Sequence, residues 1–310
     1  MQAITQNSFG GPDVLTLTEV PRPDPGPTEV LVRMRATSVN PVELFVRSGA
    51  FPMIGPPPFI LGWDVSGVVE AVDPGVSRFA VGDEVYGMPY FPKAAGAYAE
   101  YVVAPSRQLA HKPAKLSHVE AAGLPLVGLT AWQALVDVAG VRAGQRVLIH
   151  GAGGGLGHVA VQVAKHLGAE VIGTASAGKH EFLRELGADQ LIDYRETDFT
   201  EAVRDVDVVL EPIGGDYAVR SFSVLRPGGL LVTAVERTNT ALPGLARQHG
   251  VRAAAVAVEP DHVGLEHLAD LVDAGSLRVH VGATFPLAEA ARAHEHVAAG
   301  GVQGKTVLTM

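Results

Sequence analysis

One segment, residues 147–180, constrains the fold more than any other, because it has the pattern of a strand, a glycine-rich turn, a helix and a second strand. The run Val147–His150 is short, apolar and β-rich, as a buried parallel strand should be. The turn after it follows the A/G-x-G-x-x-G spacing, whose small residues let a pyrophosphate approach the backbone. The residues expected to face that pyrophosphate are Ala152, Gly153, Gly154, Gly155, Leu156 and Gly157.

The residues after the turn distinguish a dinucleotide site from an ordinary strand-to-helix turn, which is the alternative interpretation. Val159, Val163 and Leu167 recur at helical spacing, and Gly168 stands where a helix would stop. A helix beginning near Leu156 would direct its unpaired N–H groups at the phosphates. The pattern therefore favours dinucleotide binding.

The second strand bears on which dinucleotide is bound. An NAD site usually places Asp or Glu about 20 residues after the turn, on the ribose hydroxyls. Here the strand ends with Thr174, Ala175 and Ser176, and Lys179 follows. A 2′-phosphate would meet a hydroxyl and a cation, so NADP(H) is predicted. The alternative is that Lys179 is a solvated charge at the start of the next helix.

Composition excludes several classes of function. The chain has 24 basic and 33 acidic residues and a formal charge of −9, without a dense basic run, so nucleic acid is not an expected partner. Cysteine is absent, which excludes disulfides, a thiolate nucleophile and Cys-ligated zinc. No run of about 18 apolar residues and no charged-then-apolar leader occurs, so we expect a cytoplasmic protein that does not enter membranes.

The expected secondary structure changes near residue 119. Before it, short β-rich runs are punctuated by Pro and Gly; after it, helices alternate with apolar strands, which predicts an α/β Rossmann domain with a doubly wound parallel sheet. The expected strands are Val147–His150, Glu170–Thr174, Val206–Leu210, Gly229–Ala234 and Val251–Val258. The last segment is expected to return to the first domain. We therefore predict a β-rich domain of residues 1–121 and 266–310, and a Rossmann domain of residues 122–265.

Matching segments run nearly end to end and in order. They are VLVRMRATSVNPVELFVRSG, GWDVSGVVEAVDPGVSRFAVGDEVYG, GAYAEYVVAP, LPLVGLTAWQAL, VLIHGAGGGLGHVAVQVAKHLGA and a final GKTVL. The chain resembles the medium-chain dehydrogenase/reductase superfamily, in the zinc-independent quinone oxidoreductase group that includes zeta-crystallin. The resemblance implies a GroES-like catalytic domain made from both ends of the chain, NADPH-dependent hydride transfer and frequently a homodimer. The apolar strand Val251–Val258 is the candidate for dimer pairing.

No metal site is expected. Zinc alcohol dehydrogenases of this superfamily use Cys and a Gly-His-Glu segment, whereas this chain has Gly62, Trp63 and Asp64. His294 and His296 stand two apart, so on a helix they would point about 200° apart. Without a Lewis acid, an acceptor that spreads negative charge itself suits the chemistry better than a simple carbonyl.

The resemblance assigns residues near the reacting groups. Asn40 matches an asparagine that orients cofactor or substrate and is the catalytic candidate; alternatively it is a turn residue before Pro41. Phe45 stands where many relatives have tyrosine and, with Trp63 and Asp64, is expected to line the substrate pocket. For Trp63 the alternative is a core aromatic, and for Asp64 a loop tie.

The resemblance also assigns cofactor contacts. Thr130 matches a threonine near the nicotinamide, with a helix cap as the alternative. Tyr194 matches a residue of the adenosine-phosphate pocket and joins Ser176 and Lys179 in selecting NADP. Gly214 follows a parallel strand, at the edge where open α/β sheets bind ligands.

The sequence thus predicts an NADPH-dependent, zinc-independent reductase of a quinone or similar conjugated carbonyl. Two alternatives stay open: an NADPH-dependent enoyl or enone reductase, and a low-turnover NADPH-binding sensor. The proton donor also stays open between water, the nicotinamide ribose hydroxyl and a nearby tyrosine.

Overall fold

The computed structural model describes residues 1–310, which form two compact units. One unit comprises Met1–Leu129 with Glu259–Met310, and the other comprises Thr130–Val258. The sequence pattern placed the boundaries near residues 121 and 265. In the structure the first unit is longer at both boundaries. The backbone at Gly128 packs so tightly against Leu268 that an added Cβ atom would lie 2.7 Å from it, and a Cβ atom at Gly264 would lie 2.8 Å from Leu129. Such close packing ties both segments to the first unit.

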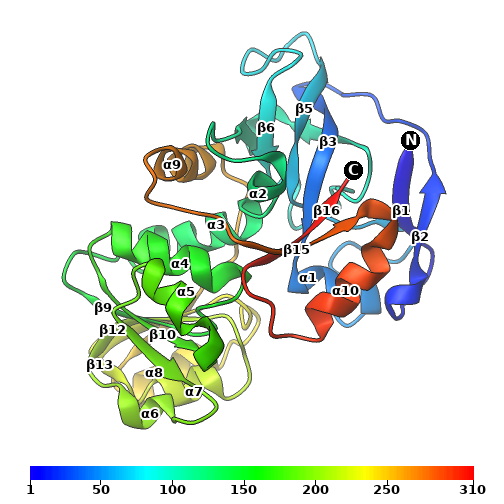
Figure 1. Ribbon diagram of the computed structural model, residues 1–310. Helices are drawn as coiled ribbons and strands as arrows, with labels where there is room; N and C mark the ends of the chain where they lie inside the picture. The colour runs from blue at the N-terminus through cyan, green and yellow to red at the C-terminus, as the bar shows by residue number, and fades with distance from the viewer. The chain divides into compact units, whose positions relative to one another are not determined.

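The unit Thr130–Val258 is built on a six-stranded parallel sheet with strand order β11-β10-β9-β12-β13-β14. Its strands are β9 (Arg146–Ile149), β10 (Glu170–Ala175), β11 (Gln190–Asp193), β12 (Val206–Glu211), β13 (Leu225–Thr233) and β14 (Arg252–Ala255). Its helices include α4 (Gly155–His166), α5 (His180–Glu185), α6 (Phe199–Ala202), α7 (Tyr217–Ser221) and α8 (Leu242–Gln248) (Figure 1). The predicted doubly wound sheet is confirmed.

The order of these strands creates a switch point at β9. The chain passes from β9 through α4 to β10 on one side, whereas β12 pairs with the other side of β9. Central strands are buried on both faces, and Leu148, Ile172, Val209 and Leu231 belong to one apolar core. At the edge, β14 covers only Arg252–Ala255, so the strand is shorter than expected and a dimer contact along it stays a prediction.

The other unit contains a seven-stranded sheet, with path β15-β16-β3-β5-β6-β8 and β7 paired to β3, and a small sheet of order β2-β1-β4. The strands are β1 (Gln2–Gln6), β2 (Leu15–Glu19), β3 (Glu29–Val39), β4 (Phe59–Ile60), β5 (Val65–Val72), β6 (Glu84–Gly87), β7 (Tyr101–Pro105), β8 (Leu109–His111), β15 (Val281–Pro286) and β16 (Lys305–Thr309). The helices are α1 (Pro41–Ser48), α2 (His118–Ala122), α9 (His262–Asp273) and α10 (Ala290–Ala298), and α3 (Pro125–Trp132) begins here.

The last segment of the chain belongs to this unit. In Figure 1 the red strand β16 lies beside β3, with which it pairs antiparallel in the register Val307 to Ser38. This pairing brings Lys305 close to the residues that follow β3, although more than 260 positions separate them in sequence. No helix in the chain has the length and apolar character needed to span a bilayer.

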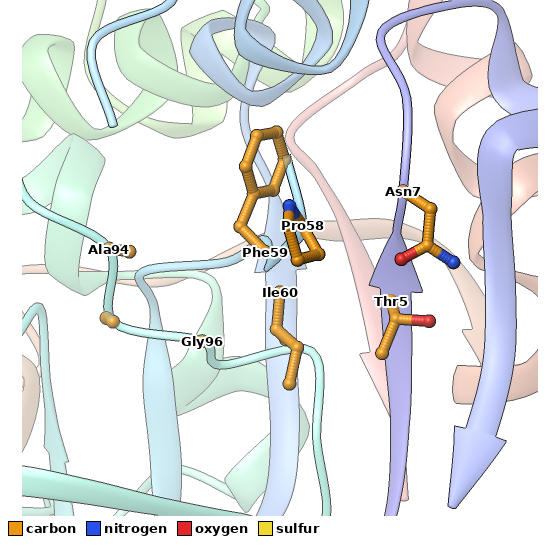
Figure 2. A pocket seen from close by; sticks show the side chains of 8 residues that line it. Thr5, Asn7, Pro58, Phe59, Ile60, Ala94 and Gly96 are labelled. Carbon is orange, nitrogen blue, oxygen red and sulfur yellow. The ribbon is translucent and has the colours of Figure 1, made fainter. Parts of the chain in front are cut away.

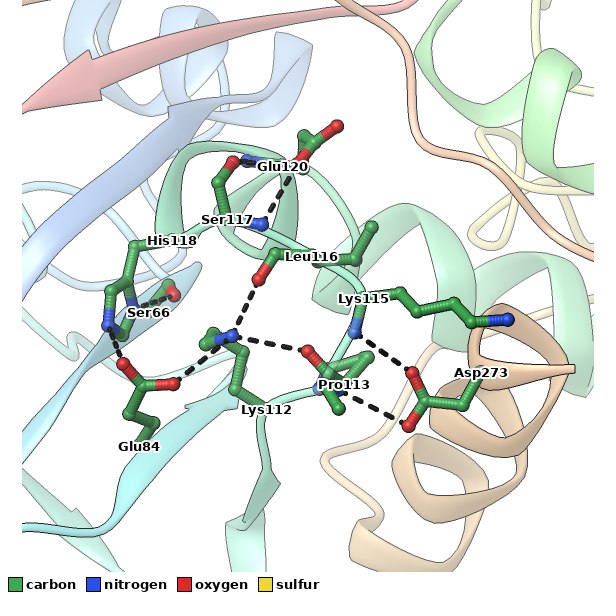
Figure 3. A network of polar contacts seen from close by, with 11 residues as sticks. Ser66, Glu84, Lys112, Pro113, Lys115, Leu116, Ser117, His118, Glu120 and Asp273 are labelled. Atoms are coloured by element: carbon green, nitrogen blue, oxygen red, sulfur yellow. Dashed lines mark hydrogen bonds and ion pairs between the residues drawn. The ribbon is translucent and has the colours of Figure 1, made fainter. Parts of the chain in front are cut away.

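A network of polar contacts holds the segment between β8 and α2 (Figure 3). The Lys112 ammonium pairs with Glu84 at 3.2 Å and donates to the carbonyl of Leu116 at 2.5 Å. From the other side, the Asp273 carboxylate accepts the backbone N–H groups of Ala114 and Lys115. The turn is therefore fixed by charge-assisted bonds from both β6 and α9.

Candidate cofactor site and buried polar cluster

The glycine turn after β9 is packed as tightly as its sequence requires. A Cβ atom at Gly157 would lie 2.3 Å from the carbonyl oxygen of Gly151 and 2.5 Å from the Cα of Ala152. Gly151 itself has φ +60°, a conformation that favours glycine. The N–H of Ala152 bonds to the carbonyl of Thr174 at 3.0 Å, which anchors the turn to β10. Only residues without bulky side chains fit this turn.

Helix α4 begins at Gly155, one residue before the predicted start, and runs for 12 residues. Its N-cap residue is Gly154, so no side chain bonds to the free N–H groups of the first turn. Those groups and the positive end of the helix dipole are available to a phosphate. The turn and helix therefore fit a dinucleotide pyrophosphate.

Positive charge gathers beyond the end of β10. The aliphatic part of Lys179 lies on the glycine turn, since a Cβ atom at Gly153 would be 2.5 Å from its Cδ. Burial lowers the pKa of Lys179, and the positive charge of Arg195 lowers it further. Tyr194 is 49% exposed, and the Arg195 guanidinium lies 5.9 Å from its ring centroid. Ser176 is the residue at which β10 gives way to the next helical turn.

Sequence reasoning missed Asp193, the carboxylate at the end of the neighbouring strand β11. It accepts backbone N–H groups from Ala177 and Arg195, each at 2.9 Å. The bond from Arg195 is the largest cause of the lowered pKa of Asp193, and the bond from Ala177 acts in the same direction. Asp193 thereby holds together the two segments that carry Ser176 and Tyr194.

The carboxyl end of β12 bears Gly214, at φ +84°, in the turn that the sequence singled out. Sequence reasoning missed the neighbouring Glu211, whose carboxylate is buried and accepts the backbone N–H of Gly214 at 2.7 Å. The available signal was an acidic residue directly after the apolar run 208–210.

In the other unit, Asn40 lies buried where β3 ends and α1 begins. Its Nδ2 donates to Asp64 at 2.7 Å, and its Oδ1 accepts from the Lys305 ammonium at 2.5 Å. Its backbone N–H bonds to Glu43 at 2.8 Å. The structure thus gives the Asn40 amide a fixed orientation, which depends on residues from two distant segments.

Asp64 and Lys305 form the charged centre of this cluster. Asp64 also accepts hydrogen bonds from the Ser38 hydroxyl and from the backbone N–H of Leu126, the latter at 2.8 Å. The Lys305 ammonium lies 3.8 Å from its Oδ2. Burial lowers the pKa of Lys305, while the charges of Asp64 and Glu43 act in the opposite direction. Lys305 had no role in the sequence prediction.

A second buried chain of hydrogen bonds starts at Arg47 and ends at Glu43. Arg47 donates to Nδ1 of His294 at 3.1 Å, so the ring proton lies on Nε2, which bonds to the Tyr98 hydroxyl at 3.0 Å. Tyr98 in turn donates to Glu43 at 2.7 Å. Burial lowers the pKa of His294 to about 3 and raises that of Glu43 to about 7. The His294 ring is therefore neutral, and it accepts a hydrogen bond from Arg47 at Nδ1 and donates one to Tyr98 from Nε2.

The expected pocket residues differ in exposure. Phe45 on α1 is 57% exposed, whereas Trp63 and Asp64 are buried. Trp63 donates its Nε1–H to the carbonyl of Lys93 at 2.7 Å and meets the edge of Phe91 at a centroid distance of 5.2 Å. Thr130, which was expected near the nicotinamide rather than in the substrate pocket, is buried in α3. Of these candidates, only Phe45 has an apolar ring that is exposed and open to contact with a ligand.

A hollow of about 500 Å³ lies elsewhere on this unit (Figure 2). Thr5 and Asn7 of the β1 segment stand on one side of it, and Phe59 and Ile60 stand on the other. The remaining lining residues are Pro58, Ala94, Ala95 and Gly96. None of the expected pocket residues contributes to this hollow.

Comparison with known proteins places these features in a family. Residues 26–114 match the alcohol dehydrogenase GroES-like domain, and residues 186–308 match the family described as zinc-binding dehydrogenase. A 2-haloacrylate reductase from Burkholderia sp is 38% identical over 322 residues, which cover 96% of this chain and 96% of the relative. The chain belongs to the medium-chain dehydrogenase/reductase superfamily.

Solved structures of this superfamily agree over the whole chain. The quinone oxidoreductase from Coxiella burnetii has a TM-score of 0.94 at 38% identity and covers 100% of this chain and 99% of its own. The Escherichia coli quinone oxidoreductase complexed with NADPH has a TM-score of 0.89 at 30% identity and covers 100% of both chains. The chain is an NADP(H)-dependent oxidoreductase of the zinc-independent quinone oxidoreductase group, and its glycine turn fits that cofactor.

The description of one matching family raises the question of zinc. The chain has no cysteine, and no group of three His, Asp or Glu side chains is arranged to hold a metal ion. At the segment where zinc relatives have Gly-His-Glu, Asp64 is saturated by hydrogen bonds and faces the Lys305 cation. A cation already buried beside the carboxylate opposes a second one, so these residues do not fit a zinc ion.

Proposed function

We propose that the protein reduces quinones, with NADPH as the electron donor. The observation that carries this proposal is a buried ion pair: Asp64, in the segment where zinc relatives hold their metal, is paired with Lys305 from β16. The buried Lys305 ammonium is already engaged by Asn40 and Asp64, so this pair does not replace the metal ion that stabilises an alkoxide in the zinc relatives. A quinone spreads the added negative charge over its own conjugated system, so it needs less help from the protein.

The proposed cofactor site follows the carboxyl edge of the parallel sheet. Ala152 to Gly157 would hold the pyrophosphate at the N-terminus of α4, while Ser176, Lys179 and Tyr194 would hold the 2′-phosphate. NADPH supplies the hydride when it is bound. The task of the chain is then to orient the reactants and to exclude water.

On the acceptor side we assign Asn40 an orienting role. Its side-chain amide is held by Lys305 and Asp64. Its backbone N–H bonds to the Glu43 carboxylate, and its backbone carbonyl accepts the N–H of Glu43, which closes the first turn of α1. One turn further along α1, Phe45 offers an exposed ring on which a flat, aromatic acceptor can stack. The buried cluster thereby fixes the helix that carries the substrate-facing ring.

A second candidate function is the reduction of an activated alkene. The 2-haloacrylate reductase from Burkholderia sp favours it, because that relative is 38% identical to this chain and its name denotes an α,β-unsaturated acid as substrate. Conjugated alkenes satisfy the same electronic argument as quinones. The two candidates therefore differ in the shape of the acceptor and in the atom that receives the hydride.

The test is NADPH oxidation with four acceptors in parallel: 1,4-benzoquinone, 9,10-phenanthrenequinone, 2-cyclohexenone and 2-chloroacrylate. NADH is the donor control. The proposal predicts the fastest turnover with the quinones and a preference for NADPH that Lys179→Gln removes. Lys165→Gln is the matched control, because Lys165 in the same unit makes a surface ion pair with Asp189.

The acceptors that are turned over distinguish quinone reduction from alkene reduction and from NADPH binding without turnover. Turnover confined to the alkenes would replace the proposal with the second candidate. Tight NADPH binding without turnover of any acceptor would contradict both and favour a low-turnover binding protein.

A further inference from the structure

Glu211 is a buried carboxylate that no sequence motif explains. It closes β12, and one of its oxygens accepts the backbone N–H of Ile213 at 2.5 Å and that of Gly214 at 2.7 Å. Its other oxygen accepts the hydroxyl of Thr233 at 3.2 Å. Every bond that it makes is thus directed at the carboxyl edge of the sheet.

Thr233 extends this arrangement to a second turn. It ends β13, the strand next to β12, and its hydroxyl oxygen accepts the N–H groups of Val235 at 3.3 Å and Glu236 at 3.2 Å. The two turns are in contact, since a Cβ atom at Gly214 would lie 3.3 Å from Val235. One carboxylate and one hydroxyl therefore set the shape of both turns.

These turns display apolar side chains. Ile213 is 48% exposed and Val235 is 50% exposed, and each stands two residues after the end of one of two paired strands. The pyrophosphate turn follows β9 and the adenosine residues follow β10, whereas β12 and β13 lie on the opposite side of β9. A dinucleotide that crosses the switch point must therefore place its nicotinamide half over β12 and β13.

We propose that Glu211 is a positioning residue for the nicotinamide half of NADPH, and that it acts through Ile213 and Val235. The inference rests on the proposed course of the cofactor along this edge. Burial raises the pKa of Glu211, and the nearby charge of Glu236 adds to that effect, while the two backbone N–H bonds oppose it. A buried carboxylate is costly to keep, and its three donors account for its presence here.

The test compares two ligands by isothermal titration calorimetry: NADPH and adenosine 2′,5′-bisphosphate, which contains only the adenosine half. Glu211→Ala should weaken NADPH about tenfold or more, because three donors lose their acceptor, and should leave the bisphosphate unchanged. Glu211→Gln should restore part of the NADPH affinity, since its carbonyl can accept both backbone N–H groups, whereas its NH2 group cannot accept the hydrogen bond that the Thr233 hydroxyl donates. Thr233→Val should weaken NADPH while retaining the bisphosphate.

The matched control is Asp207→Ala, at the opposite end of β12. Asp207 accepts the backbone N–H of Arg146 at 2.8 Å and pairs with Arg226, so its removal disturbs the same strand without touching the carboxyl edge. It should leave the affinity for both ligands unchanged.

The proposal is overturned if Glu211→Ala or Thr233→Val binds NADPH like the wild type, or if both ligands weaken equally, which would indicate general destabilisation. If Glu211→Ala does not fold, Thr233→Val decides alone. Wild-type protein that fails to bind the bisphosphate, or binds it equally well after Lys179→Gln, would instead contradict the proposed course of the cofactor. Because no acceptor is present, the result is independent of the quinone proposal.

Discussion

Replacing Lys305 by methionine should unbalance the buried cluster around Asn40. Lys305 has a side chain only 3% exposed, and methionine preserves most of its length while removing the charge. The change leaves the Asp64 carboxylate buried without its cation and leaves Oδ1 of Asn40 without its donor. Removing one partner of a buried ion pair costs about 3–5 kcal/mol. Because the ammonium and the carboxylate are 3.8 Å apart and Asp64 keeps three other donors, we expect about 3 kcal/mol.

The assay is urea unfolding followed by the fluorescence of Trp63, in a Trp132→Phe background so that the signal reports on the unit that holds the cluster. A double-mutant cycle with Asp64→Asn isolates the pair. Since neutralising Asp64 removes the charge that Lys305 balances, the double variant should be more stable than the sum of the single effects predicts, by about 2 kcal/mol. A loss below about 1 kcal/mol for Lys305→Met, or strict additivity in the cycle, would refute the reasoning.

Three further predictions concern the glycine turn and the second buried chain. Gly157→Ala should destabilise the protein by about 3 kcal/mol and abolish NADPH binding, because the new Cβ would meet the Gly151 backbone at 2.3 Å; retained binding in calorimetry would contradict this. Gly153→Ala should displace the flexible Lys179 side chain and raise KM for NADPH about tenfold with little change for NADH, whereas equal effects on both would show that Lys179 does not select the phosphate. Glu43 has its pKa raised from 4.5 to about 7, so the folded state binds more protons than the unfolded state over that interval, and stability should fall as pH rises through it. Measured by urea unfolding at several pH values, this fall should reach about 3 kcal/mol relative to Glu43→Gln, and parallel profiles would contradict it.

Local patterns predicted the features that are encoded locally. The strand, glycine turn and helix of residues 147–166 occur as expected because their periodicity and small residues act within a few positions. The doubly wound sheet followed from the alternation of apolar strands and helices. The edge strand β14 was overestimated, because an apolar run is longer than the part of it that pairs with β13.

The polar clusters could not be predicted in the same way, because their partners are distant in sequence. The family resemblance singled out Asn40 from the segment around it, but its donor Lys305 is 265 positions away. The sequence offered His294 and His296 as a ligand pair or, with more weight, as solvated or partly buried residues, and it gave no sign that His294 is fully buried and bonded to Arg47, 247 positions earlier. Glu211 is closer to its partners, but nothing in its strand indicates that two turns depend on it.

Deuterium at C4 of the nicotinamide of NADPH reports directly whether the protein transfers a hydride from NADPH to the acceptor, with NADH labelled in the same way as the control. With the quinones we expect a primary isotope effect on NADPH oxidation. If an activated alkene is the acceptor, the label should also appear on its β-carbon, identified by mass spectrometry. No isotope effect in single-turnover experiments, with no label in any carbon product, would contradict direct hydride transfer. If labelled NADH and labelled NADPH were oxidised at equal rates, the assignment of NADPH as the donor would be contradicted.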